Sequence, residues 1–69
     1  MTAEKLAEAA AACDELAAAL ARAGIVLPSL GLDPVSYSYE RPRVLVELGR
    51  CNLETTYQLI GVLKRAVDR

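Results

Sequence analysis

Residues 52–68 have the sequence NLETTYQLIGVLKRAVD, which predicts a helix that begins at a good N-cap, Asn52. Glu54 lies in the first turn and basic residues lie near the end, as the helix dipole favours. Apolar residues occupy well over half of the helix circumference, which is wider than the single stripe of an ordinary surface helix. We therefore expect this helix to be covered on two sides.

Residues 2–24 predict a second long helix, because their interior is dominated by Ala, Leu and Glu. Thr2 can serve as its N-cap, and Gly24 stands where a C-terminal glycine is expected. A heptad seam with small residues at half its positions suits packing against another helix. The seam consists of Leu6, Ala9, Cys13, Leu16, Leu20 and Ala23. The residues expected to form the core are Leu16, Leu20, Ile60 and Leu63.

Between the helices, residues 25–34 (IVLPSLGLDP) predict an apolar connector that lies over the core, since its prolines and glycine exclude a helix. Residues 35–48 predict a β-hairpin, because Val35, Tyr37 and Tyr39 alternate with polar residues, and valines alternate again after Arg41-Pro42. The expected fold is therefore a single small α+β domain over residues 1–69. Its order is helix, apolar connector, β-hairpin, helix, with the helices antiparallel or crossing beneath the ribbon.

An alternative places a short helix at Val44–Leu48, a turn at Gly49 and a second helix after it, which is the outline of a helix-turn-helix. This alternative predicts a nucleic-acid-binding regulator that uses arginines on its surface. The alternating valines favour a strand instead, and the net charge of −1 argues against strong phosphate binding. The arginines concerned are Arg41, Arg43, Arg50 and Arg65.

The composition points to a domain near the lower size limit for independent folding. The chain has 69 residues, is 54% apolar and contains neither Trp nor Phe, so its core must come mainly from smaller side chains. We expect its stability to depend partly on self-association. A signal peptide and a membrane-spanning run are not expected from the sequence, which predicts a cytoplasmic protein with reduced thiols.

Catalysis is not expected, because the chain has no histidine, the commonest general base and metal ligand. Two isolated cysteines form no metal-binding motif, and the four glycines form no phosphate loop, so no metal or cofactor is predicted. For Cys51 we make one chemical hypothesis, that its thiol is reactive. It precedes the helix N-cap and follows Arg50, an environment that favours a reactive thiol.

The sequence thus favours a non-catalytic protein–protein interaction or adaptor module that binds itself and another protein. We expect it to dimerise through the first helix, the edge of the hairpin or the spare apolar face of the last helix. Tyr and Arg are common in binding hot spots, and the hairpin carries a Tyr/Arg patch. The candidate interface residues are Leu16, Leu20, Tyr37, Tyr39, Arg41, Arg43, Leu59, Val62 and Ala66.

The segments LPSLGLDP (27–34) and LGRCNLETTYQLIGVLKRA (48–66) carry a resemblance. The chain resembles short actinobacterial proteins whose C-terminal half has an L-G-x-C-N-x-E-T pattern before a final helix. The resemblance covers about residues 25–66 and implies a bacterial cytoplasmic protein. Its motif implies no activity and no functional residue.

Overall fold

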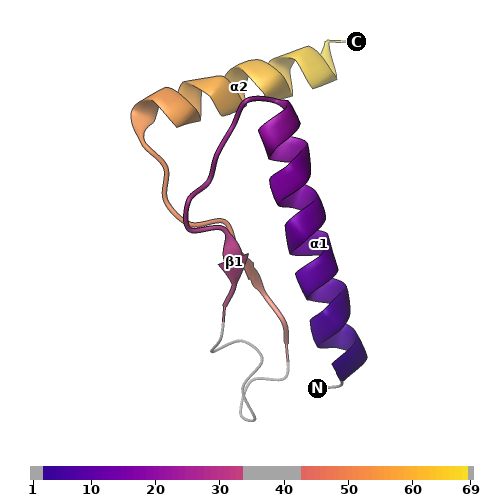
Figure 1. Cartoon of the computed structure of the whole chain (residues 1–69). Helices are drawn as coiled ribbons and strands as arrows, with labels where there is room; N and C mark the ends of the chain where they lie inside the picture. The colour runs from indigo at the N-terminus through magenta and orange to yellow at the C-terminus, as the bar shows by residue number, and fades with distance from the viewer. Residues whose placement is uncertain (1–2, 34–42, 69) are drawn as a thin grey trace.

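The chain folds into two helices with a short antiparallel hairpin between them (Figure 1). The structure, a computed structural model, describes residues 3–33 and 43–68. The elements in chain order are α1 (Ala3–Arg22), β1 (Gly31–Leu32), β2 (Val46–Glu47) and α2 (Leu53–Val67). The α+β fold class and the positions of both helices are confirmed.

The heptad seam of α1 is the side of the helix that faces the rest of the molecule. Among the side chains described between Glu4 and Arg22, the half-buried ones are those of Leu6, Ala9, Cys13, Leu16 and Leu20. All belong to the predicted seam. The remaining seam residue, Ala23, lies just beyond the helix end and is exposed. The helical periodicity of small and apolar residues therefore predicted the inward face correctly.

The end of α1 is closed by a Schellman motif, in which Gly24 adopts a left-handed φ of 77°. The backbone N–H of Ile25 donates to the carbonyl of Leu20 at 2.9 Å, and that of Gly24 donates to the carbonyl of Ala21 at 3.0 Å. This turn directs Ile25 inward, where its side chain is 1% exposed. It is the only fully buried side chain in the described residues.

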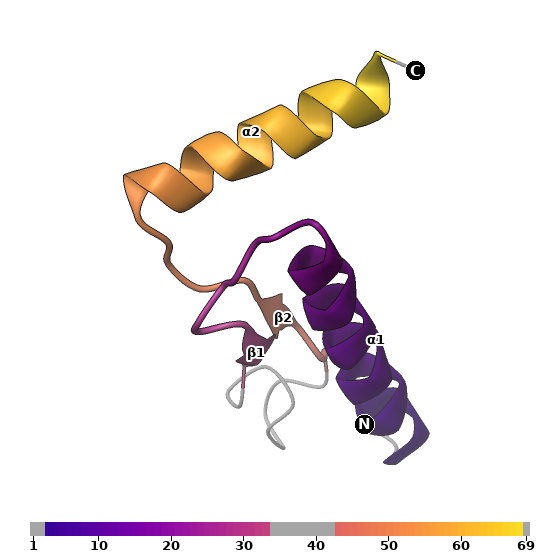
Figure 2. The same cartoon turned by 45° about the horizontal axis from the view of Figure 1, so that its top comes forward.

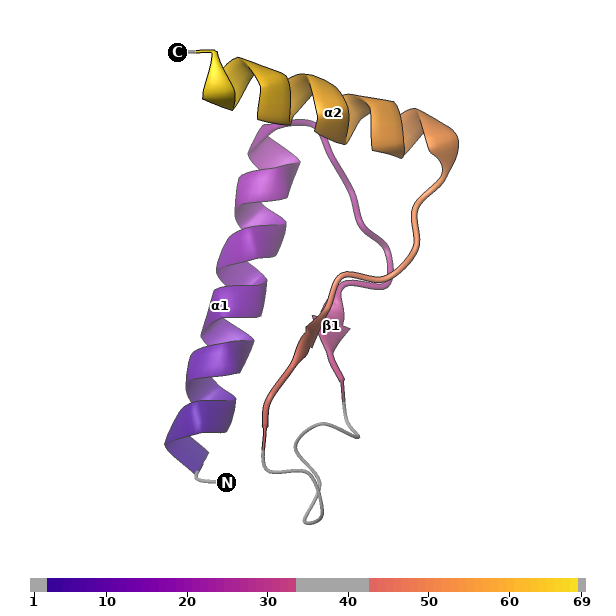
Figure 3. The same cartoon turned by 180° about the vertical axis from the view of Figure 1, so that it is seen from behind.

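The hairpin pairs residues that are far apart in sequence. Gly31 lies opposite Glu47 and Leu32 opposite Val46, and the Asp33 N–H extends the ladder to the Leu45 carbonyl at 2.9 Å. β1 packs on α1 (Figures 1 and 3). The expectation that residues 25–34 form only a connector is wrong, because their end pairs with β2. Residues 35–42, expected to hold the first strand and the turn, lie outside the described part.

The helix-turn-helix alternative is wrong for the residues on which it depended. Val46 and Glu47 form β2, and residues 43–45 and 48–52 contain no helix. Val46, one of the alternating valines, lies in a strand, the conformation that β-branched side chains favour.

The two helices cross, one of the two arrangements expected, but α2 does not pack against the α1 seam. α2 runs across the C-terminal end of α1, while β1 and the connector lie against the α1 seam (Figures 1 and 2). As a result, Ile60 and Leu63, which were expected in the core, are 41% and 60% exposed. Leu16 and Leu20 are half-buried as part of the seam. The reason is that the hairpin has taken the place on α1 that we expected α2 to occupy.

Neither helix meets the length and apolarity needed to cross a bilayer, within residues 3–33 and 43–68.

Candidate interaction surface

The start of α2 is fixed by its N-cap. The side-chain oxygen of Asn52 accepts the backbone N–H of Thr55 at 2.9 Å, as predicted for this residue. Its carbonyl accepts both the N–H and the hydroxyl of Thr56, each at 3.0 Å. The bond to the Asn52 side chain satisfies an N–H that the start of the helix leaves without an intrahelical partner. The rotation of α2, and so the direction of each of its faces, follows from this starting point.

One side of α2 is turned toward the rest of the molecule. The half-buried residues of α2 are Thr55, Thr56, Leu59, Gly61 and Val62. Of these, Thr55, Leu59 and Val62 recur at intervals of four and three residues and so share one side. The side chain of Ala66, one turn further on, is exposed. The inward side of α2 is therefore short and is covered only toward the start and middle of the helix.

A second apolar side of α2 is open to solvent. Its residues follow one another at intervals of four, three, three and four, which places them within about 120° of the helix circumference. We call this set the α2 stripe. It consists of Leu53 (69% exposed), Tyr57 (65%), Ile60 (41%), Leu63 (60%) and Val67 (81%). Isolated exposed apolar residues are ordinary, but a contiguous apolar face marks an interaction site.

At 100° per residue, Lys64 lies within the arc of the α2 stripe, and Asp68, Glu54 and Arg65 lie beyond Tyr57 on one side of it. All four side chains are exposed. The border of the last turn therefore carries both signs of charge. Glu54 in the first turn and Lys64 and Arg65 in the last turn complement the helix dipole at their own ends.

The candidate interface residues lie in three different environments. Leu59 and Val62 are on the inward side of α2, and Leu16 and Leu20 belong to the half-buried α1 seam. The side chains of Arg43 and Ala66 are exposed. The remaining candidates, Tyr37, Tyr39 and Arg41, lie outside the described residues.

Sequence reasoning placed Leu53, Tyr57 and Val67 in the wide apolar arc of α2 but not among the candidate interface residues. The signal was present, because the apolar arc of α2 was recognised as too wide for one neighbour. The sequence could not show which part of that arc faces outward, since this depends on the direction in which residues 48–52 bring the chain into the helix.

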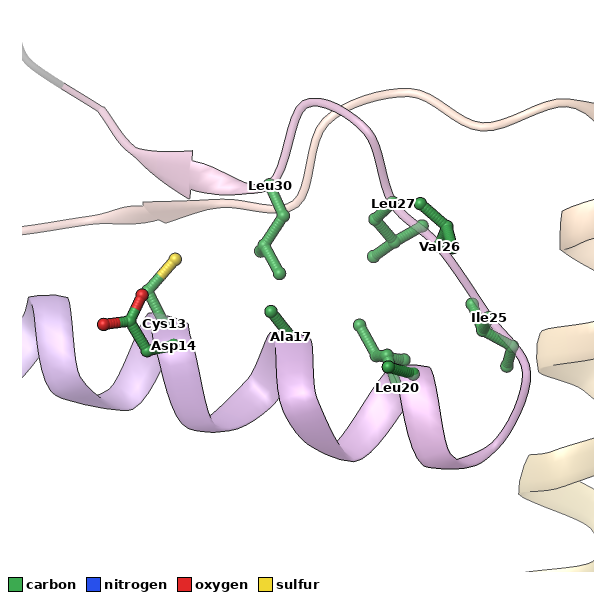
Figure 4. A pocket seen from close by; sticks show the side chains of 9 residues that line it. Cys13, Asp14, Ala17, Leu20, Ile25, Val26, Leu27 and Leu30 are labelled. Carbon is green, nitrogen blue, oxygen red and sulfur yellow. The ribbon is translucent and has the colours of Figure 1, made fainter.

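An apolar cleft of about 260 Å³ lies between α1 and the connector (Figure 4). Leu27 and Leu30 of the connector face Ala17 and Leu20 of α1 across it. Its volume is below the roughly 300–1,000 Å³ of small-molecule sites, and such sites also hold several converging polar groups. Asp14 is the only carboxylate in its lining. The cleft is therefore best described as incomplete packing of the core.

Neither cysteine forms a disulfide. Cys13 is half-buried and lines the cleft, while Cys51 is exposed with its sulfur 3.5 Å from the Thr56 hydroxyl. The reactivity of Cys51 stays a prediction. Across the residues with described positions, no three Cys, Asp or Glu side chains gather in a way that could hold a metal ion.

No protein family, curated protein or solved structure matches the chain. The resemblance to short actinobacterial proteins therefore stays a prediction.

Proposed function

We propose that this chain is a non-catalytic protein–protein interaction module that docks through the α2 stripe and associates with itself. The observation that carries the proposal is the exposure of five apolar side chains on one side of a capped helix. The hydrophobic effect favours removing such a face from water. Because the five side chains are contiguous, a single partner surface can cover them together.

The overall dimensions support the same proposal. The accessible surface is 5652 Å², whereas a compact protein of 7.4 kDa exposes about 4,200 Å². The radius of gyration is 14.1 Å, against about 11 Å for a compact domain of this length. The chain thus leaves uncovered an area that a domain folded only on itself would bury.

The small core is a further argument for association. With one fully buried side chain among the described residues, the fold has little apolar burial to offset the conformational entropy of ordering the chain. A partner that covers the α2 stripe supplies the missing burial. The proposal includes a bacterial, cytoplasmic setting, with which the two unpaired cysteines are consistent.

Light scattering coupled to size exclusion tests the proposal with two matched variants of α2. Ile60→Asp introduces a charge at the centre of the stripe, and Gln58→Asp introduces the same charge on the exposed polar side. We expect the wild type and Gln58→Asp to exceed the monomer mass of 7.4 kDa, and Ile60→Asp to run as a monomer. Circular dichroism serves as the control, and we expect both variants to keep the helix content of the wild type.

Thermal unfolding gives an independent measure of association. Because self-association stabilises only the folded state, the midpoint of the wild type should rise with protein concentration, while that of Ile60→Asp should not. A wild type that stays monomeric and melts at one temperature at all concentrations contradicts the proposed self-association. Added salt distinguishes self-association from phosphate binding, because it weakens phosphate contacts strongly but barely affects the burial of apolar surface.

A further inference from the structure

We infer that the occupant of the α2 stripe is the α2 stripe of a second copy, packed antiparallel about a two-fold axis at Ile60. This inference rests on the proposed function and specifies the partner, its direction and its register. Two-fold pairs in which both copies use the same surface are the commonest arrangement of homo-oligomers. Such a surface must be complementary to itself, and the α2 stripe meets this requirement in three ways.

The first is its spacing. The intervals of four, three, three and four residues are symmetric about Ile60. When a second α2 runs in the opposite direction through that point, each stripe residue meets an apolar residue of the other copy. Ile60 meets Ile60, Tyr57 meets Leu63, and Leu53 meets Val67. No stripe residue is left facing a polar position.

The second is charge. In an antiparallel pair, the border that carries Glu54 in one copy lies beside the same border of the other copy, running in the opposite direction. Position 66 lies opposite Glu54 in this register, so Arg65 of the other copy is one position away and Lys64 and Asp68 are each two positions away. The direction is therefore selected by the helix dipoles, which are opposed in an antiparallel pair, whereas a parallel pair places like ends together.

The third is exposure and access. The five side chains of the α2 stripe are between 41% and 81% exposed, so a second copy can reach all of them. The α2 stripe also lies on a different side of the helix from Leu59 and Val62. A second helix can therefore approach it without displacing α1 or the hairpin, since α2 lies at one end of the molecule (Figures 1 and 2).

Disulfide cross-linking between single-cysteine variants tests the direction and register. Both native cysteines are first replaced, as Cys13→Ala and Cys51→Ser, and Leu53→Cys and Val67→Cys are then made separately. Positions 53 and 67 are about 21 Å apart along a helix, whereas the Cα atoms of a disulfide lie about 4.4–6.8 Å apart. Antiparallel packing therefore joins 53 to 67, and parallel packing joins each position only to itself.

We expect an equimolar mixture of Leu53→Cys and Val67→Cys, oxidised with copper phenanthroline, to give a covalent dimer that reductant removes. Each variant alone should stay monomeric on a denaturing gel. A mixture of Tyr57→Cys and Leu63→Cys repeats the test nearer the two-fold axis, where the crossing angle of the helices matters less. Gln58→Cys, on the polar side, is the control for random collision and should not cross-link.

The outcomes separate this inference from the proposed function. Cross-linking of Leu53→Cys with itself means a parallel pair and overturns the inference. If the wild type associates and Ile60→Asp dissociates it, but neither mixture cross-links, the antiparallel register is overturned while the interaction module stands. A wild type that is monomeric at all concentrations overturns both.

Discussion

Gly49 lies directly against Ser29, so closely that a Cβ on Gly49 would be 2.6 Å from the Cβ of Ser29. Gly49 also has a left-handed φ of 81°. At this contact, the connector after α1 meets the segment that leads from β2 into α2. It therefore positions the start of α2 relative to the rest of the molecule.

Gly49→Ala should be the most damaging glycine substitution in the described part of the chain. A left-handed alanine costs about 1–2 kcal/mol, and the approach to Ser29 adds a clash with backbone and Cβ atoms that cannot rotate away. We expect the free energy of unfolding, measured by urea denaturation, to fall by more than the conformational cost alone.

Substitutions at two other glycines distinguish the conformational cost from the clash with Ser29. Gly24 has a left-handed φ of 77° but no atom within 4 Å of an added Cβ, so Gly24→Ala should show only the conformational cost. Gly31 has neither feature, and Gly31→Ala should be close to neutral. Equal losses for Gly49→Ala and Gly24→Ala would mean that the contact with Ser29 is unimportant.

Asn52→Ala should reduce the helicity of α2. The substitution removes the bond from the Thr55 N–H, a loss of about 1 kcal/mol for an N-cap. A helix of 15 residues with little tertiary packing is marginal by itself, so the effect should appear locally. Amide hydrogen exchange in α2 should accelerate in Asn52→Ala, while Asn52→Asp, which keeps a capping oxygen, should exchange like the wild type.

Ile25→Ala should destabilise the monomer by about 2–5 kcal/mol, because it truncates the only fully buried side chain described. Leu63→Ala removes a side chain that is 60% exposed and should change monomer stability by less than about 0.5 kcal/mol. Both substitutions are best compared in the Ile60→Asp background, which removes association. A large loss for Leu63→Ala there would mean that α2 packs on the rest of the molecule by its other side.

Cys51 should react with iodoacetamide before Cys13 in the folded protein. Cys51 is exposed, whereas Cys13 is half-buried in the cleft between α1 and the connector. Peptide mass spectrometry after a short exposure measures the two rates. In urea the two cysteines should react at similar rates, and faster modification of Cys13 in the native protein would contradict its position in the fold.

The helices could be predicted from the sequence because their signals are local. Asn52 caps α2 within three residues of itself, and Gly24 ends α1 through bonds to the preceding turn. The α1 seam was also predictable, since its five half-buried residues share one side of a single helix. The position of β1 was not, because pairing Gly31 with Glu47 depends on residues sixteen positions apart.

The same division between local and long-range signals applies to the candidate interaction surface. The sequence by itself determined that α2 is a capped helix with an apolar arc too wide for one neighbour, because capping and helical periodicity depend only on nearby residues. Only the tertiary structure decided which part of that arc is free. The hairpin occupies the α1 seam, and the contact between Gly49 and Ser29 directs α2 across the end of α1, so Leu59 and Val62 turn inward while the α2 stripe meets solvent.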